Sequence, residues 1–391
     1  MALHFLPLCV KIKDSFFCLR TAMSSIPLVT TDPAVMRLAH PLRCAAAQSD
    51  FLPVLQNFFG PYTWSCLQTA FCDSTKMTTA AIIELCESPR HQRLKKMVQH
   101  SAQMTGGTEL GNAYASLIFV RHALAPQPYF VIDDALVELL EQTDIARDIP
   151  LSMLNLPYPR FFLEFGKLRQ NGLAVPNTET GNHVLEGAYC EYGKHPQKGE
   201  GLFVLLTGSP LGKSNAMDDA TYSVFLSFRN RDLTLEEALN DAFASGTQAA
   251  QQMGLRPPTA ALKGPGLGLM LFLAKVLLYI GLPEARRTIH NDRAAWAKET
   301  AGLQSAAKRA KAQKRARGLT DHVLISAPPP SATSAFTPSE TGRTVRSHWR
   351  RGHYRLQPHG PQLSLKRLVF IRPTLVHSAT GDAPVSEYLV T

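Results

Sequence analysis

The sequence lacks closely spaced cysteine pairs and any apolar run long enough to cross a membrane. Its seven cysteines are odd in number, and none forms a C-x-x-C motif. This pattern argues against a disulfide scaffold or a zinc ribbon and indicates free thiols in a reducing compartment. The apolar run at residues 267–282 is 16 residues long and contains Lys275. It is short for a membrane span and predicts a buried core helix.

Acidic residues are scarce near the C-terminus, and none occurs between residues 341 and 381. Residues 301–381 carry 14 lysines and arginines against two acids, Asp321 and Glu340, while the net charge of the whole chain is +10. The basic character is therefore concentrated in this segment. A localised basic patch usually meets a polyanion, most often RNA or DNA and less often a membrane surface.

No targeting segment stands out. The first ten residues, MALHFLPLCV, resemble a short signal-peptide core, but Lys11, Lys13 and Asp14 follow directly. A true start at Met23 or Met36 explains this segment about as well. We therefore expect a cytoplasmic protein in its bacterial host, with no membrane partner.

Hydrophobic periodicity separates a helical part of the chain from a strand-rich part. Residues 78–100 have a helical pattern that breaks near Pro89, and FVIDDALVELLEQTDI at 130–145 has apolar residues at helical spacing. After Pro150, short segments rich in aromatic and β-branched residues predict strands. These segments are RFFLEF (160–165), HVLEGAYCEY (183–192), LFVLLT (202–207) and TYSVFLSF (221–228).

Helices are expected again after the strands. Thr234 and Glu237 have the spacing of a capping box, which predicts a helix that runs to about Met253. The stretch AAKRAKAQKRARG at 306–318 has helical propensity but little apolar face. Together these patterns predict an α+β fold with a helical N-terminal part, an antiparallel sheet of about four strands with packed helices, and a basic C-terminal segment.

A chain of 391 residues is long enough for two domains or for one large domain with appendages. The predicted boundaries are 1–75 for an uncertain N-terminal region, 76–290 for an α+β core domain, 291–325 for a basic helical segment, 326–345 for a disordered linker, and 346–391 for a basic C-terminal motif with a terminal strand.

Two glycine-rich stretches invite comparison with nucleotide-binding loops. LFVLLTGSPLGKS at 202–214 has three residues between its glycines where a P-loop needs four, and a strand pattern follows it instead of a helix. We therefore expect a polar hairpin loop. GPGLGLM at 264–270 lacks both a preceding strand and the G-x-G-x-x-G spacing, so we expect a loop and the start of a helix.

Metal and catalytic sites have little support in the sequence. The histidines at 348, 353, 359 and 377 could ligate a metal or serve a nuclease as acid and base, but flanking arginines would repel a cation. The acids Asp133, Asp134, Glu138 and Glu141 are expected on the solvated face of a helix. No spacing argues for a Ser/His/Asp or Cys/His triad. We therefore expect no catalytic residues, no metal and no cofactor.

The segment SHWRRGHYR at 347–355 allows two interpretations. In the first, arginines and lysines contact phosphates while aromatic rings stack on unpaired bases, and Gly352 permits a tight turn. In the second, the aromatic residues pack under a terminal strand and the arginines are solvated or paired with the acids at 133–141. The candidate residues for binding RNA or a partner are His348, Trp349, Arg350, Arg351, Gly352, His353, Tyr354, Arg355, Lys366 and Arg367.

Three stretches give the chain a resemblance to a known family. They are the acidic segment at 131–165 that leads into LNLP and an aromatic strand, the apolar segment LMLFLAKVLLYIGLPEA at 269–285, and RRGHYR with the downstream RLVFIRPTLV. This order resembles the type V-A anti-CRISPR family, the second of the AcrVA inhibitors, whose homologues occur on phages and plasmids. The resemblance covers about residues 110–376.

The resemblance implies a regulatory binding protein that is not an enzyme. The family's inhibitor is understood to recognise the N-terminal part of the type V-A effector nuclease as it emerges from the ribosome, after which effector protein and its mRNA fall. The implied partner is the effector's nascent chain, and the basic C-terminal region suggests RNA or ribosome contact. The alternatives are a phage or plasmid RNA-binding protein and a histidine-dependent ribonuclease.

Overall fold

The computed structural model describes most of the chain between residues 33 and 376. The described residues are 33–36, 38–48, 52–73, 78–96, 118, 121–122, 125, 127–145, 149–166, 173–177, 181–195, 198–209, 220–252, 260–316, 319–328, 348–372 and 374–376. From residue 329 onward the predicted linker lies outside this set, as do His377 and residues 210–214 of the glycine-containing stretch at 202–214.

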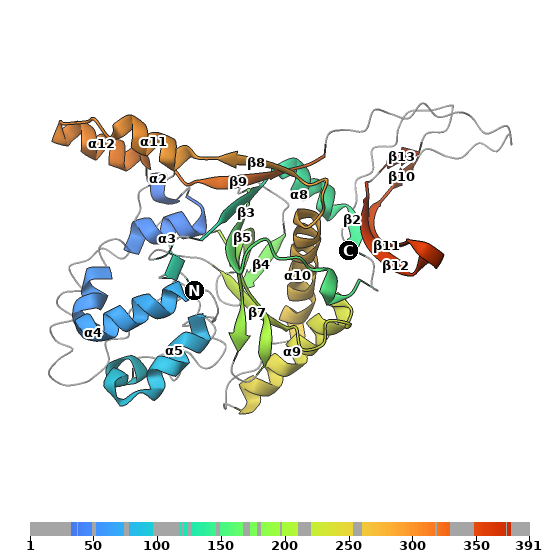
Figure 1. The fold of residues 1–391 in the computed structure, drawn as a ribbon, viewed down its shortest axis with the longest axis horizontal. Helices are drawn as coiled ribbons and strands as arrows, with labels where there is room; N and C mark the ends of the chain where they lie inside the picture. Colours follow the sequence, from blue (N-terminus) through green and yellow to red (C-terminus); the bar gives the residue numbers. More distant parts are fainter. Residues whose placement is uncertain are drawn as a thin grey trace.

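A mixed β-sheet forms the centre of the molecule (Figure 1). Its neighbours are antiparallel except that β1 runs parallel to both β3 and β9. In the described part of the chain the sheet has eight strands, in the order β7 (Thr221–Ser227), β6 (Gly199–Gly208), β5 (Gly181–His195), β3 (Arg160–Phe165), β1 (Tyr129–Ile132), β9 (His322–Ser326) and β8 (Arg286–His290), with β4 (Ala174–Asn177) paired to the start of β5.

The α+β class is confirmed, whereas an antiparallel sheet of about four strands is not. The four segments expected as strands coincide with β3, β5, β6 and β7, which are antiparallel neighbours. The sheet continues past β3 because β1, β9 and β8 add to that side. β1 and β9 are four and five residues long, and such short apolar runs carry no period that separates strand from helix.

The segment at 130–145 is not one helix, contrary to expectation. After β1, helix α8 (Asp134–Glu141) begins behind Asp133, whose Oδ1 accepts a 2.6 Å hydrogen bond from the Leu136 amide. Strand β2 (Thr143–Ile145) follows at once. Asp133 has the extended backbone of an N-cap residue. A helix starts after such a residue, so the preceding apolar residues are free to form a strand.

Helices α8, α9 (Leu235–Gln252) and α10 (Ala260–Ile280) cover one face of the sheet (Figure 1). The capping box forms as predicted: the Glu237 amide donates to Thr234 Oγ1 at 3.2 Å, and the Thr234 amide donates to the Glu237 carboxylate at 2.9 Å. α10 is the expected core helix, with most residues from Leu269 to Ile280 buried. No described helix is long and apolar enough to cross a membrane.

The glycines expected in a loop before this helix lie inside it instead. α10 includes Pro265 and Gly266. A Cβ atom on Gly266 would lie 2.2 Å from the Tyr222 hydroxyl oxygen. Glycine therefore allows α10 to approach β7 closely, which the sequence pattern could not reveal.

Helices of the N-terminal region lie on the opposite side of the sheet (Figure 1). They are α2 (Pro33–Met36), α3 (His40–Gln48), α4 (Leu52–Cys72) and α5 (Thr78–Glu87), followed by the 3-10 helix η1 (Pro89–His91) near the expected break. Cys44 of α3 packs in a second buried cluster with Phe162, Tyr189 and Leu205. Part of the uncertain N-terminal region therefore completes the hydrophobic core.

Two structures extend from this core. Between β8 and β9, helices α11 (Asp292–Thr300) and α12 (Ala306–Ala316) form a hairpin, here named the α11–α12 arm. Near the C-terminus, β12 (Leu365–Ile371), β11 (Gly352–His359) and β2 form the C-terminal sheet, with η3 (Pro361–Leu363) between β11 and β12, while β10 (His348–Arg350) pairs with β13 (Thr374–Val376). The domain boundaries stay a prediction, although β9 places residues 322–326 inside the main sheet.

Candidate functional site in the C-terminal sheet

Tyr354 attaches the C-terminal sheet to the core. Its ring is fully buried, 5.0 Å from the Phe370 ring, and its hydroxyl donates a 2.8 Å hydrogen bond to the carbonyl oxygen of Lys275. Burial raises the pKa of the Tyr354 phenol well above its usual value, so it stays a neutral donor. Tyr354 therefore packs as the second interpretation predicts, and its ring is not available to stack on a base.

Lys275 secures the same junction with its side chain. Its Nζ donates to the carbonyl oxygens of Leu140 at 2.8 Å and Thr143 at 2.6 Å. Burial lowers the pKa of this ammonium, while the charges of Asp144 and Glu141 oppose that shift. A cation at the C-terminal end of α8 also complements the helix dipole. The lysine in the apolar run thus joins α8, β2 and α10.

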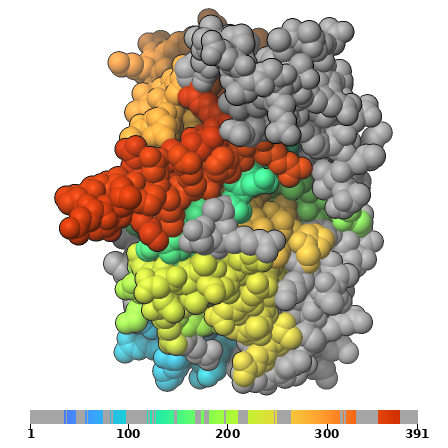
Figure 2. Space-filling model, turned by 90° about the vertical axis from the view of Figure 1, so that its right-hand side faces the viewer, coloured from blue at the N-terminus to red at the C-terminus, as the bar shows by residue number. Residues whose placement is uncertain are grey.

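The basic side chains of β11 and β12 lie mainly on the outer face of the C-terminal sheet. Tyr354 pairs with buried Phe370, so residues one position away point to the other side. Exposed Arg355 is one of these, and exposed Arg367 lies opposite Gln357. In Figure 2 this segment, in red, forms a ridge that projects beyond the rest of the face. Lys366 is also exposed, opposite Pro358 near the β11–β12 connection.

Arg351 forms an ion pair with Asp144 of β2, an acidic residue outside the predicted set of partners. Arg351 Nη1 lies 3.5 Å from Asp144 Oδ1, and the two side chains are 60% and 62% exposed. The expected partners were the acids at 133–141, but Asp133 caps α8 instead. An exposed pair of this kind stabilises a protein by about 0–1 kcal/mol. Arg351 is therefore still able to contact a phosphate.

The other candidate residues fall into two groups. His348, Trp349 and Arg350 form β10, and their side chains lie outside the described set. Gly352 is buried at the start of β11, where it pairs with Thr143 in extended backbone. The expected tight turn at Gly352 is therefore wrong, because this residue belongs to a strand.

The described histidines of this segment cannot share one metal ion. His353 and His359 belong to the same strand, six residues apart, which corresponds to roughly 20 Å at 3.3 Å per residue. The same separation prevents them from acting together as the acid and base of a nuclease. The next described element after β6 is β7, which is its antiparallel neighbour, whereas the strand of a P-loop is followed by a helix.

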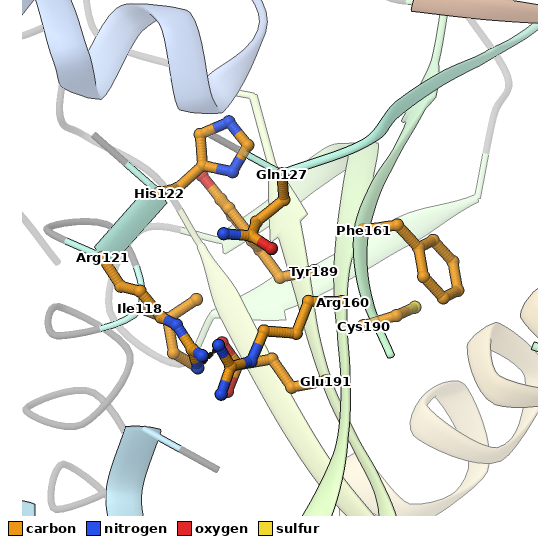
Figure 3. A pocket seen from close by; sticks show the side chains of 9 residues that line it. All are labelled: Ile118, Arg121, His122, Gln127, Arg160, Phe161, Tyr189, Cys190 and Glu191. Atoms are coloured by element: carbon orange, nitrogen blue, oxygen red, sulfur yellow. Dashed lines mark hydrogen bonds and ion pairs between the residues drawn. The ribbon is translucent and has the colours of Figure 1, made fainter. Parts of the chain in front are cut away.

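A small hollow lies between β3, β5 and the residues Ile118, Arg121 and His122 (Figure 3). In this view the head groups of Arg121, Arg160 and Glu191 converge, while Phe161 points away on the other side of β3. Arg121 Nη1 lies 2.8 Å from Glu191 Oε1, and burial lowers the Arg121 pKa. The hollow offers about 10 Å³ to the centre of a water molecule, which is space for about one water. It is too small for an organic ligand.

Sequence reasoning missed Lys275, Phe370 and Asp144 as parts of this site. The only advance signal was the single lysine within an apolar helix, which needs polar partners when it is buried. The pairing of β2 with β11 joins residues about 200 positions apart, and no local pattern predicts such a contact.

Comparison with known proteins agrees with the resemblance seen in the sequence. Residues 130–378 match the AcrVA2-like family, described as the anti-CRISPR type V subtype A2 family. The match covers more than half of the chain and includes most of β1 and all of the C-terminal sheet. No curated protein and no solved structure matches the chain. The chain belongs to the anti-CRISPR type V subtype A2 family.

Proposed function

We propose that this protein inhibits type V-A CRISPR interference without catalysing a reaction. In this proposal it binds the nascent N-terminal polypeptide of the effector nuclease, and effector protein and mRNA then fall. Family membership supports the inhibitory role. Binding of the nascent chain is the mechanism that the family resemblance implies. The protein would act in the cytoplasm, where the effector is synthesised.

The exposed edge of the main sheet is the observation that carries peptide binding. β8 pairs with β9 on one side and has no partner strand among the described residues on its other side. Four of its five residues are exposed, and the Ile289 side chain is 71% exposed. An open strand edge presents unpaired backbone N–H and C=O groups, to which an extended peptide can add as a further strand. A polypeptide leaving the ribosome is an extended ligand of this kind.

Exposed basic residues support an accessory contact with RNA or the ribosome. Arg355, Lys366 and Arg367 project from the C-terminal sheet, and Lys308 and Arg309 are exposed on α12. Phosphate contacts by such residues release counterions and are sensitive to salt. The same residues also favour the alternative, an RNA-binding protein with no peptide partner.

The proposal is tested in cells that carry a type V-A effector, with and without this protein. Effector protein and effector mRNA are measured for the native gene and for a gene whose N-terminal peptide is altered. We expect both quantities to fall for the native peptide only. If effector protein and mRNA fall equally for both genes, the RNA-binding alternative is favoured. If they fall for neither gene, nascent-chain recognition is refuted.

A matched pair of substitutions tests the role of β8. Ile289→Glu places a charge on the edge strand, whereas Ile289→Val keeps it apolar. We expect the glutamate variant to lose the effect on the effector and the valine variant to retain it. Equal activity of two folded variants would place peptide recognition elsewhere.

A further inference from the structure

Two histidines and one aspartate meet at the base of the α11–α12 arm. His290 is the last residue of β8, His322 is the first residue of β9, and the two are directly opposed in the sheet. Their rings are stacked, with centroids 4.7 Å apart and planes 6° apart. Asp292 begins α11 two residues later, and one ligand atom from each of the three side chains lies within 4.8 Å of the others.

The hydrogen bonds around this cluster leave nitrogen lone pairs available. His322 Nδ1 lies 3.0 Å from the carbonyl oxygen of Thr320. A carbonyl can only accept, so Nδ1 carries the proton and Nε2 keeps its lone pair. Metal-binding histidines are commonly oriented by such a bond from their second nitrogen. His290 Nε2 is buried and has no hydrogen-bond partner among the described residues, and a buried polar atom without a partner is unfavourable unless a ligand meets it.

The surrounding residues hold the cluster in place. Asp321 Oδ1 accepts hydrogen bonds from the Arg293 and Ala294 amides at 3.0 and 3.2 Å, so it fixes the start of α11 beside β9. The Arg287 guanidinium donates to carbonyl groups around the end of α10. Asp321 is a second acidic residue next to His322 in the sequence, and Arg293 follows Asp292 directly.

We propose that His290, Asp292 and His322 bind one divalent transition-metal ion. Two imidazoles and one carboxylate form the donor set that Zn²⁺ accepts, with water in the fourth position. Zinc–nitrogen bonds of about 2.0–2.1 Å would place the two nitrogens about 3.3 Å apart. The stacked rings must therefore turn slightly toward each other, which two half-buried side chains at strand ends can do.

The ion would fasten the arm to the main sheet. α11 has no buried residue, so apolar packing contributes little to its position. One ion would join the end of β8, the start of β9 and the start of α11. It would thereby set the direction in which basic α12 projects, which is a structural role separate from the peptide edge of β8.

The test uses the full chain with no polyhistidine tag, freed of metal with a chelator and then titrated with Zn²⁺. We expect one bound ion per chain by calorimetry and a rise of several degrees in the melting temperature. Asp292→Asn should weaken zinc binding at least tenfold, and His290→Gln with His322→Gln should abolish it. His359→Gln, on the C-terminal sheet, serves as the matched control and should bind as the wild type does.

Two further measurements keep the result decisive. Co²⁺ bound at this site should give visible absorption that is lost in the double histidine variant. Because Asp292 is exposed, Asp292→Asn should fold even if the double variant does not, and circular dichroism checks this. Failure of the wild type to bind Zn²⁺ or Co²⁺, or undiminished binding by folded Asp292→Asn and double histidine variants, would overturn the proposal.

Discussion

The Tyr354 hydroxyl donates a 2.8 Å hydrogen bond to the carbonyl oxygen of Lys275, and the Lys275 ammonium in turn donates to the carbonyl oxygen of Thr143. Thr143 pairs with Gly352 across β2 and β11. The candidate binding surface is therefore continuous with the core helix α10, so its orientation depends on buried contacts.

Substitutions at Tyr354 separate these buried contacts from the exposed charges. Tyr354→Phe removes one hydrogen bond and should lower the free energy of unfolding by about 1 kcal/mol. Tyr354→Ala also removes a buried ring and should cost about 3–5 kcal/mol. Urea unfolding measures both values. Exposed Arg355→Ala is the control, expected within about 0.5 kcal/mol of wild type, and a comparable loss there would contradict the assignment.

The buried ion pair between α3 and β5 should be essential for stability. Arg43 donates to both carboxylate oxygens of Glu186 at 2.9 Å, and both side chains are 0% exposed. Glu186→Gln leaves a buried cation without its counter-charge and should destabilise the protein by about 3–5 kcal/mol.

A double variant tests whether these two residues act as a unit. Arg43→Met combined with Glu186→Met removes both charges, so it should cost less than the sum of the single substitutions Arg43→Met and Glu186→Met. Denaturant unfolding of the wild type, the two single methionine variants and the double variant gives the coupling free energy between the two residues. Strictly additive losses would show that the pair is not a unit.

His122 should make stability fall in mild acid. Burial, with a smaller contribution from His40, lowers the pKa of His122 to about 4 from its usual 6.5. Between pH 6.5 and about 4, His122 is therefore protonated in the unfolded chain but neutral in the folded protein. This group alone should cost about 2 kcal/mol at pH 5 and about 3 kcal/mol at pH 4.

The comparison protein for this effect is His122→Gln, which cannot titrate. As pH falls from 7 to 4, the free energy of unfolding should decrease more in the wild type than in the variant. A difference that stays constant over this range would mean that His122 titrates normally.

The basic residues of the C-terminal sheet should determine RNA affinity but not folding. Changing Arg355, Lys366 and Arg367 together to alanine should weaken RNA binding. It should also reduce the slope of log affinity against log salt concentration by about 2, since each contact to single-stranded RNA contributes about 0.7. Fluorescence anisotropy at several salt concentrations measures this slope.

Three exposed basic residues that follow η1 in the sequence provide a matched control. Alanine at Arg93, Lys95 and Lys96 removes the same charge from another surface, so only the long-range attraction should change. An equal loss of salt dependence in both triple variants would indicate a general charge effect and no defined RNA surface.

Local chemistry explains which elements could be predicted. The Thr234–Glu237 capping box and the strands at 160–165 and 202–207 depend on neighbours in the sequence, and they occur where expected. The strand at 129–132 was missed because its apolar residues continue into those of α8 without a break in spacing. Only the extended backbone of Asp133 separates the two elements.

The site depends on contacts between distant parts of the chain, so little of it could be predicted. The pairing of His290 with His322 follows from the register of β8 and β9, which the α11–α12 arm separates in the sequence. Tyr354 could be named as a candidate, but its partner Lys275 lies 79 positions earlier. Sequence spacing could not distinguish a ring that packs from a ring that binds.

The position of β9 also constrains how this protein is made. β9 inserts between β1 and β8, and the Ala327 amide donates to Asp133 Oδ2 across 194 residues. Until residue 326 has left the ribosome, β1 has an open edge and β8 has no partner. Such non-local pairing slows folding, so a chain that stalls before β9 would present two unpaired strands to chaperones and proteases. The sheet can thus be completed only after β9 has been synthesised.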